Sequence, residues 1–393
     1  MRDLAVIADD LSGAHDAGAQ IFLRGYPCCS LNSKNILKTK AWEVPVFNTA
    51  TRLLSGSQAY LETLKIAANL KHYAKIFKKT DSTLRGNIGQ ELTACMDALN
   101  VNKAAFVPAF PAMGRYCIYG RHFLNAKIIE NTEFAKDSLN RINTSDIIAL
   151  LKCQTKYSAV LIDIDAVRKG TKAIKRLIKR SKNSKPTIYV YDCLEEKDLK
   201  IIAKSIKGFK VVAGAAAVLK YLLNKKKPIA FKPAKNVKTK QVCFVGSQTK
   251  TTRMQLKLLK NKYKLKQLDP MTAKCLKTER KNIIIASGHT KMKRHNLNPV
   301  SGNNEAIFKA FAKKAKELIS SGHYGRIIMS GGSTAENICK ALNINILRIC
   351  KVISVGIPLT YSPEKNMFIV TKPGGYGHKQ IMIKIYNVLK ELK

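Results

Sequence analysis

Three polar turns in the first third of the sequence carry side chains that could bind and act on a small polar ligand. Asp9 and Asp10 directly follow a short apolar run at residues 4–8. Residues 78–87, KKTDSTLRGN, bring cations, a carboxylate and hydroxyls together in a few positions. Such a density of polar groups is costly to hold unless a polar ligand satisfies them. The candidate side chains in this second turn are Lys79, Asp81, Ser82 and Arg85.

The third turn, residues 108–115, also follows an apolar run and ends on Arg115. A planar guanidinium suits a two-point hydrogen-bonded grip on a carboxylate. Ligands of open α/β folds bind at the carboxyl ends of the strands, which is where these turns are expected. A simpler interpretation exists for the first turn, in which Asp10 or Ser12 only caps the following helix.

Glycine-rich turns of a different character lie in the second half, at residues 245–247, 330–335 and 371–377. Glycines at strand-to-helix turns let backbone amides approach a phosphate, and a helix N-terminus adds partial positive charge. None of the turns matches the Walker pattern GxxxxGK[ST] or the dinucleotide pattern GxGxxG. Tight turning alone would explain each one, but three in one half indicate an anion site.

Short apolar runs that alternate with helical patterns must position these turns, and this alternation predicts a parallel sheet with crossover helices. The strands predicted in the first half span residues 4–7, 44–47, 104–107, 159–164 and 187–191. The predicted helices span residues 14–24, 57–70, 89–99, 166–180 and 196–205. The fold class that follows is α/β with doubly wound architecture.

A chain of 393 residues exceeds the size at which single cores usually stop growing, so we expect two domains. Residues 224–240, NKKKPIAFKPAKNVKTK, combine two prolines with dense lysine and no periodicity, which is typical of a linker. The sequence therefore predicts two doubly wound, parallel-sheet-type α/β domains, at residues 1–223 and 241–393, with an active-site cleft between them. The second domain has predicted strands at residues 241–245, 282–286, 326–329 and 367–370.

The formal net charge of +44 raises the question of a nucleic-acid partner. Lysine is scattered through nearly every segment, however, and aromatic residues make up only 7% without interleaving with a basic stretch. A single-strand stacking platform would require that interleaving. Nucleic-acid binding is therefore not the function that the sequence favours.

Other compositional features indicate the compartment and argue against a structural metal site. No apolar run approaches the roughly 20 residues needed to span a bilayer, and two aspartates interrupt the start where a secretory signal would continue. The ten cysteines form no CxxC pair, and the seven histidines form no HExxH motif. We expect a cytoplasmic protein without a structural transition-metal site, and the metal ligands of the functional site stay unknown.

The strings DSTLRG at residues 81–86 and PAFPAMGR at residues 108–115 resemble motifs of one family, the four-carbon acid sugar kinases. This family includes D-threonate, D-erythronate and 3-oxo-tetronate kinases. The resemblance runs through nearly the whole chain in the family's order. The other strings that carry it are IADDLSGAHDAG, NTATR, VGSQTKTTRMQ, SGGSTAENICKAL and TKPGGYG.

The resemblance implies that the N-terminal domain binds a sugar acid and that the C-terminal domain binds ATP, which agrees with the two kinds of turn. Family members usually carry Asp or Glu where Ser333 stands, and Ala50 and Ala215 also replace usually polar residues. The residues that the resemblance assigns to the nucleotide are Ser247, Gly331, Gly332, Ser333, Thr334 and Gly375.

Phosphoryl transfer requires in-line positioning, neutralised phosphate charge and a group that accepts the hydroxyl proton. Asp10 is the expected base for the attacking terminal hydroxyl, with Asp81 as the alternative. Mg²⁺ is expected to bridge the β and γ phosphates of ATP. The cations that can hold the carboxylate of the acid are Lys79, Arg85 and Arg115, and Asp9, Asp10 and Asp81 can bind its hydroxyls.

The sequence thus predicts an ATP-dependent kinase that phosphorylates the terminal hydroxyl of threonate, erythronate or 3-oxo-tetronate. Two other classes stay open. One is an isomerase or aldolase partner that uses the same sugar-acid pocket without ATP, and the other is a basic nucleic-acid-binding protein. The expected partners are the sugar acid and ATP, with no membrane, and a homodimer is compatible with the sequence.

Overall fold

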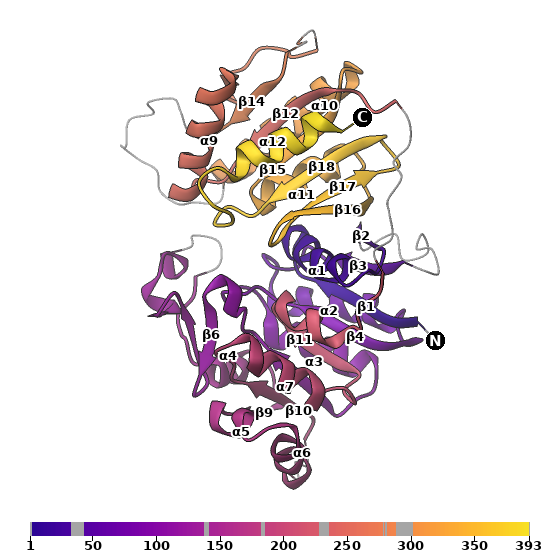
Figure 1. Cartoon of the computed structure of the whole chain (residues 1–393), viewed down its shortest axis with the longest axis vertical. Coiled ribbons are helices and arrows are strands. Elements are labelled where there is room, and N and C mark those ends of the chain that lie inside the picture. The colour runs from indigo at the N-terminus through magenta and orange to yellow at the C-terminus, as the bar shows by residue number, and fades with distance from the viewer. Residues whose placement is uncertain are drawn as a thin grey trace. The chain divides into compact units, whose positions relative to one another are not determined.

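The computed structural model describes residues 2–32, 43–136, 141–181, 185–227, 236–277, 279, 281–287 and 302–392. The chain divides into two compact units, residues 1–228 and residues 229–393 (Figure 1). This division falls within residues 224–240, the predicted linker, of which residues 228–235 lie outside the described part of the chain. Each unit is described separately below.

Unit 1 is built on a sheet in which every pair of neighbouring strands is parallel. Most residues of its strands are buried, as expected of a parallel sheet covered on both faces. Its strand order is β2 (Cys28–Asn32), β3 (Val44–Asn48), β1 (Arg2–Ala8), β4 (Tyr73–Lys79), β11 (Val211–Gly214), β5 (Lys103–Val107), β10 (Thr187–Tyr191) and β9 (Ser158–Ile162).

Helices cover both faces of this sheet, which makes unit 1 doubly wound as the sequence predicts. On one face α2 (Gly56–Ala68) packs against α3 (Ile88–Ala98), and α3 packs against α4 (Ile147–Gln154). The other group contains α1, α6, α7 and α8, which contact one another in the pairs α1 with α8, α7 with α8 and α6 with α7. Their bounds are α1 (Leu11–Leu23), α6 (Thr171–Arg180), α7 (Glu196–Ser205) and α8 (Leu219–Leu222).

A small antiparallel sheet follows the polar turn at residues 108–115 and was not predicted. It consists of β6 (Arg115–Ile118), β7 (Arg121–Leu124) and β8 (Lys127–Ile128). Cys117 of β6 exchanges two backbone hydrogen bonds, of 2.9 and 3.0 Å, with Cys193 just after β10. This pairing ties the small sheet to the end of the large one.

Unit 2 contains a mixed sheet. Its strands are parallel from β13 to β18, but β17 and β16 add an antiparallel edge, so the expectation of a parallel-sheet-type domain holds for only part of the sheet. The strand order is β13 (Lys266–Leu268), β14 (Ile283–Ala286), β12 (Lys240–Val245), β15 (Tyr324–Ser330), β18 (Met367–Lys372), β17 (Ile357–Ser362) and β16 (Ile346–Ser354).

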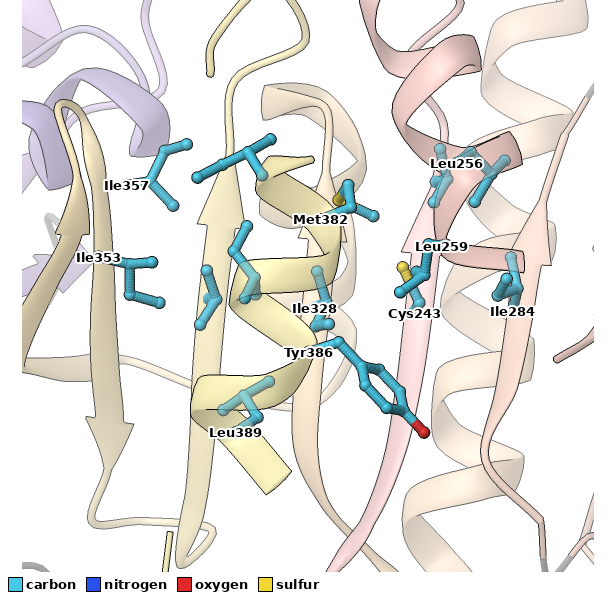
Figure 2. Close-up of a cluster of buried hydrophobic side chains, with 14 of the residues drawn as sticks. Cys243, Leu256, Leu259, Ile284, Ile328, Ile353, Ile357, Met382, Tyr386 and Leu389 are labelled. Carbon is cyan, nitrogen blue, oxygen red and sulfur yellow. The ribbon is translucent and has the colours of Figure 1, made fainter. Parts of the chain in front are cut away.

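Helices also lie on both faces of this second sheet. Figure 2 shows Leu259 of α9 (Lys250–Tyr263) and Met382 of α12 (Ile381–Glu391) in one buried cluster with Cys243 and Ile328 of the strands. Burying an aliphatic side chain of this size contributes roughly 1.5–3 kcal/mol. Phe244 belongs to the opposite face, where its ring packs edge-on against Phe311 of α10 (Gly302–Ser320) at 6.3 Å. The structure also describes α11 (Gly332–Ala341) in this unit.

Several predicted elements differ from the structure in instructive ways. The predicted helix at residues 166–180 is two helices, α5 (Ile164–Arg168) and α6, because Gly170 takes a left-handed φ of +92° between them. The predicted strand at residues 159–164 ends at Ile162, since the Asp163 side chain caps α5 through the Ala166 amide at 2.8 Å. Among the described residues, no helix is both long and apolar enough to cross a membrane.

The predicted turn at residues 78–87 also begins too early. Lys78 and Lys79 are the last residues of β4, a strand that the sequence prediction missed. Three lysines in YAKIFKK conceal a strand whose last four residues are all buried. The polar turn itself therefore starts at Thr80.

Candidate functional site

The polar turns of unit 1 meet at the carboxyl ends of adjacent parallel strands. β1 and β4 are neighbours, and Ala8 lies opposite Lys79 in their register. The chain continues from these strand ends into Asp9 and Asp10 on one side and into Asp81 on the other. The three aspartates are almost fully buried, with residue exposures of 1%, 9% and 8%.

Arg52 joins these turns, although the sequence analysis gave it no role. Its Nε and Nη2 donate to the two carboxylate oxygens of Asp9 at 2.7 and 3.0 Å. Its Nη1 and Nη2 donate to the two oxygens of Asp10, both at 2.8 Å, and Nη1 lies 3.8 Å from Asp81 Oδ1. One guanidinium therefore holds two adjacent carboxylates and lies near a third.

The two carboxylates that share Arg52 differ in their proton affinity. Burial favours the neutral form of Asp9, but the charges of Arg52 and Lys78 outweigh it and lower the pKa of Asp9. Burial raises the pKa of Asp10, because the attraction of Arg52 is offset by the negative charges of Asp9 and Asp81. Asp10 is therefore the more basic of the two carboxylates.

Asp10 also confirms the simpler interpretation of its turn. Its Oδ1 accepts a hydrogen bond from the Gly13 amide at 2.7 Å, so it is the N-cap of α1, which begins at Leu11 and not at Ala14. Capping occupies one lone pair of the carboxylate and fixes its orientation. The capping role and a chemical role are thus compatible in this side chain.

Asp81 and Arg85 form the other ion pair of the site. Arg85 donates to Asp81 from Nε at 2.8 Å and from Nη2 at 3.1 Å, and the Thr83 amide and hydroxyl donate to the same carboxylate. Burial opposes ionisation here, but Arg85 and Arg52 hold the pKa of Asp81 well below its ordinary value. The Arg85 guanidinium lies over the Phe134 ring, 5.1 Å from its centroid.

The two consecutive lysines at the end of β4 point to opposite faces of the sheet, as successive strand residues do. Lys78 Nζ lies 3.0 Å from Glu91 Oε2 of α3, and these side chains are 0% and 1% exposed. Lys79 Nζ donates to the Thr80 carbonyl at 2.7 Å and lies 3.8 Å from Asp16 Oδ2 of α1. Lys78 is thus in a closed ion pair, whereas the contact between Lys79 and Asp16 is looser.

The two remaining residues predicted for the acid site, Ser82 and Arg115, lie beside these groups. The Ser82 carbonyl is 2.9 Å from Nε2 of His122, a fully buried side chain on β7 whose pKa burial lowers to about 4. Arg115 is 7% exposed, and its Nη1 donates to the Met113 carbonyl. The structure therefore gathers all the residues predicted for the acid site in unit 1.

Three loops of unit 2 meet at the carboxyl ends of β12, β15 and β18, which are neighbours in the sheet. The amides of Gly246 and Ser247 donate to the Ser330 carbonyl at 3.1 and 3.2 Å. The Gly331 amide donates to the Lys372 carbonyl at 3.0 Å. The three glycine-rich turns found in the sequence are thus parts of one loop cluster.

The groups of this loop cluster that are available to a ligand are backbone amides. Gly331 has a φ of +113° and is the N-cap of α11, whose first turn receives no hydrogen bond from a capping side chain. The early amides of α11, at Gly332, Ser333 and Thr334, therefore have no partner within the helix. A Cβ built on Gly375 would meet nothing within 4 Å in the described part of the chain. This arrangement of amides and open space suits an anion.

Lys372 and Gln255 donate hydrogen bonds to backbone carbonyls of the third loop, residues 371–377. Lys372 Nζ donates to the carbonyls of Pro373 and Gly374 at 2.9 and 3.2 Å and lies 3.3 Å from the Thr252 hydroxyl. Gln255 Nε2 donates to the Tyr376 carbonyl at 3.2 Å. Because Lys372 is 1% exposed, burial lowers the pKa of its ammonium to about 7.

Three residues of these clusters were missed as functional candidates: Arg52, Asp16 and Lys372. Each lies in a string that carries the family resemblance, and Arg52 follows β3 as Asp9 follows β1. That position after a strand was the signal available in the sequence. Within the described ranges, no group of three or more His, Cys, Asp or Glu side chains is placed to hold a metal ion.

Comparison with known proteins supports the division into two ligand-binding units. A family model described as a sugar-binding N-terminal domain matches residues 4–222, and one described as a nucleotide-binding C-terminal domain matches residues 242–382. A D-erythronate kinase of Heliobacterium modesticaldum is 30% identical over 276 residues, which cover 67% of this chain and 61% of that protein. A D-threonate kinase of Salmonella typhimurium is 24% identical over 427 aligned residues, 99% of both chains.

A solved structure shares the fold over the whole length. The crystal structure of a Salmonella typhimurium LT2 protein, described as a candidate tRNA synthase, superposes with a TM-score of 0.83 at 21% identity and covers 98% of each chain. At that identity the likeness concerns the fold alone. Together with the two domain matches, the motifs and the names of the relatives show that this chain belongs to the four-carbon acid sugar kinase family.

Proposed function

We propose that the chain is an ATP-dependent kinase that phosphorylates the terminal hydroxyl of a four-carbon sugar acid, namely threonate, erythronate or 3-oxo-tetronate. The observation that carries the proposal is the buried cluster in which Arg52 binds both Asp9 and Asp10 beside Lys79. So many charges in one buried place are costly to a protein that does not use them. The named relatives, which are kinases of such acids, give the reaction class.

In unit 1, Asp10 is the proposed base. A carboxylate with a raised pKa accepts a proton from a hydroxyl more readily than one with a depressed pKa, and burial raises the pKa of Asp10 while Arg85 and Arg52 hold that of Asp81 low. Asp81 is therefore better suited to fixing Arg85 than to removing a proton. The groups proposed to bind the acid itself are Asp9, Lys79, Ser82, Arg85 and Arg115.

In unit 2, the loop cluster is the proposed nucleotide site. Backbone amides at the start of α11 and near Gly375 would bind phosphate oxygens, as amides at helix N-termini do. The carbonyls of the third loop accept hydrogen bonds from Lys372, from Gln255 and from the hydroxyls of Thr249 and Thr252, which leaves the opposite side of that loop to the ligand. The residues proposed to contact ATP are Ser247, Gly331, Gly332, Ser333, Thr334 and Gly375.

Mg²⁺ is proposed to accompany ATP and to supply charge neutralisation at the transferred phosphate. Mg²⁺ commonly keeps several waters and takes only one or two protein carboxylates in addition to phosphate oxygens. A carboxylate that stays ionised suits this mode, and Arg85 and Arg52 hold the pKa of Asp81 well below its ordinary value. Asp81 is the carboxylate that could take such a place in unit 1, since Asp10 is the proposed base.

The test is ADP release when each four-carbon acid is added to the full chain with ATP and Mg²⁺. The proposal expects release that depends on one or more of the acids and that equals the phosphorylated product in amount. An Asp10→Asn variant should release far less ADP while still binding the acid. Acid binding by the wild type without any ADP release would instead favour an isomerase or aldolase partner, and the kinase proposal would be wrong.

A further inference from the structure

His122 of β7 is a histidine next to the acid site. Its side chain is fully buried, and both ring nitrogens have neighbours at hydrogen-bonding distance. Nε2 lies 2.9 Å from the Ser82 carbonyl oxygen, and Nδ1 lies 3.1 Å from the sulfur of Cys117, which is also fully buried, on β6. A general base must reach the proton that it removes. His122 therefore suits a positioning role and not a catalytic one.

The partners of the two ring nitrogens fix the tautomer of His122. A backbone carbonyl only accepts hydrogen bonds, so the proton of the neutral ring is on Nε2, which faces the Ser82 carbonyl. Burial, with a smaller effect of Arg115, lowers the pKa of His122 to about 4 against the opposing effects of the Ser82 carbonyl and Asp81, so the ring is neutral at pH 7. Nδ1 is then an acceptor, and the Cys117 thiol is its donor. Burial holds the pKa of this thiol well above its usual range, which keeps the proton on sulfur.

The Ser82 carbonyl belongs to the acid turn, residues 80–87. Inside this turn the Thr83 and Leu84 amides donate to Asp81, each at 3.2 Å, and Arg85 pairs with the same aspartate. Leu84 has a left-handed φ of +63°, which is costly for a residue with a side chain. Such a conformation persists only where the surrounding structure holds it. The backbone of the acid turn therefore needs support from outside the turn.

The two ends of the acid turn have partners elsewhere in unit 1. The Thr80 amide donates to the Gly214 carbonyl at 3.0 Å, and Gln154 Nε2 donates to the Gly86 carbonyl at 3.1 Å. His122 holds the backbone between these two ends. Its hydrogen bond is thus placed to fix the middle of the turn.

His122 can give this support because the small sheet that carries it is itself fixed. The His122 amide donates to the Ser145 carbonyl at 2.9 Å. Cys117 exchanges two backbone hydrogen bonds with Cys193, directly after β10. None of these three bonds involves the acid turn. A path from Cys193 through Cys117 and His122 to Ser82 thus joins the middle of the turn to the large sheet.

We propose that Cys117 and His122 form a hydrogen-bonded relay that positions the acid turn through the Ser82 carbonyl, and that the affinity for the sugar acid depends on this relay. The inference rests on the proposed function for the identity of the ligand. Both members of the relay are fully buried, so they act through the turn and not on the acid itself. Loss of the Nε2 donor leaves the buried Ser82 carbonyl without this hydrogen bond and lets Asp81 and Arg85 move together.

The first experiment compares His122→Met with His122→Gln in the full chain. The two new side chains are similar in size, but only glutamine can donate a hydrogen bond to the Ser82 carbonyl. Calorimetry without nucleotide should show the Kd for the four-carbon acid raised by about tenfold or more in His122→Met and by less than about threefold in His122→Gln. The affinity for ATP should match that of the wild type in both variants. Wild-type acid affinity in His122→Met, or an equal loss in both variants, would overturn the inference.

The thiol of the relay has a matched control in unit 1. Cys28 on β2 is another buried cysteine, 2% exposed, and its sulfur donates to the Gly18 carbonyl at 3.2 Å. Cys117→Ala and Cys28→Ala should both lower Tm, since each removes a buried thiol and its hydrogen bond. Only Cys117→Ala should weaken acid binding, by about threefold or more, and Cys117→Ser, which keeps a donor to Nδ1, should bind as the wild type does. Equal acid affinities in the two alanine variants would show that the Cys117 thiol has only a structural role and would overturn the relay.

Two further measurements need no substrate and separate this inference from the kinase proposal. NMR of the chain with ¹⁵N-labelled histidine should show a neutral His122 ring with its proton on Nε2 at pH 7, and a proton on Nδ1 would overturn the relay. Hydrogen exchange in peptides that cover residues 80–87 should be about tenfold faster in His122→Met than in the wild type or in His122→Gln. If the wild type binds no four-carbon acid but the exchange rates differ in this way, the proposed function fails and the positioning of the turn by the relay stands. Equal exchange rates in the three proteins would show that the inference is wrong.

Discussion

Arg85 holds Asp81 through two hydrogen bonds, of 2.8 and 3.1 Å, one to each carboxylate oxygen. The sequence analysis treated the two residues as separate, with Arg85 for the carboxylate of the acid and Asp81 as an alternative base. Their pairing couples these roles, since the arginine keeps Asp81 ionised and the aspartate orients the guanidinium. A substrate carboxylate would then meet an arginine that is already fixed in position.

Replacement of Arg85 by alanine is expected to lower kcat/KM for the acid by a factor that corresponds to about 2–5 kcal/mol. The loss has two sources, the unpaired substrate carboxylate and the Asp81 side chain that loses its partner. The affinity for ATP should barely change. Steady-state kinetics and nucleotide titration measure the two quantities, and Arg85→Lys, which keeps the charge but not the fork, should lie between. Unfolding without a separable kinetic defect would show that Arg85 only stabilises the fold.

Asp10→Asn is expected to lower kcat by about 10²–10⁴-fold, the usual contribution of a general base. Asparagine caps helices as well as aspartate does, so α1 should remain intact. In the wild type, kcat should fall as the pH drops through the pKa of Asp10, which burial raises above its ordinary value. A pH profile of kcat measures this. If Asp81→Asn abolishes the low-pH decline and Asp10→Asn leaves it, Asp81 is the base.

The loop before α11 should tolerate a change of charge better than a change of shape. Ser333→Asp restores the residue type that is usual in the family and keeps a good N-terminal side chain, so we expect KM for ATP to change by less than about 1.4 kcal/mol, or tenfold. Gly332→Val should weaken ATP binding far more, because a β-branched side chain blocks the approach of phosphate to the amides. Calorimetric titration with ATP compares the two. Wild-type affinity in Gly332→Val would place the nucleotide elsewhere.

Lys372 should take up a proton when nucleotide binds. Burial lowers the pKa of the Lys372 ammonium to about 7, so at pH 8 this side chain is mostly the neutral amine in the free protein. A polyanion bound at the neighbouring loops favours the charged form and raises that pKa. Calorimetry at pH 8 in Hepes and in Tris, which differ in ionisation heat, should show net proton uptake in the wild type and less in Lys372→Met. Equal binding heats in the two buffers would contradict the prediction.

The sequence predicted the fold class and grouped the site residues because both depend on local pattern. Apolar runs with polar turns identify the strands beside Asp9 and Arg115, and the glycine turns identify the loops of unit 2. β4 was missed because its three lysines conceal the apolar pattern of a buried strand. The ion pairs of Lys78 and Lys79 could not be predicted either, because they depend on which helix covers each face of the sheet. Neither the pairing of Arg85 with Asp81 nor the contact of His122 with Ser82 could be predicted, since both depend on distances in the folded chain.

The position of β11 bears on how the protein is made. This strand, residues 211–214, is the last of unit 1 in the sequence, yet it lies between β4 and β5 in the middle of the sheet. β4 ends 132 residues and β5 ends 104 residues before β11 begins, so during synthesis their facing edges stay without a partner strand until β11 is made. Exposed strand edges recruit other chains. We expect a nascent chain halted before residue 211 to aggregate or require a chaperone. The ends of β1 and β4, with Asp9 and Lys79, can pair without β11, but the turn after Val107, which carries Arg115, is joined to them only when β11 inserts.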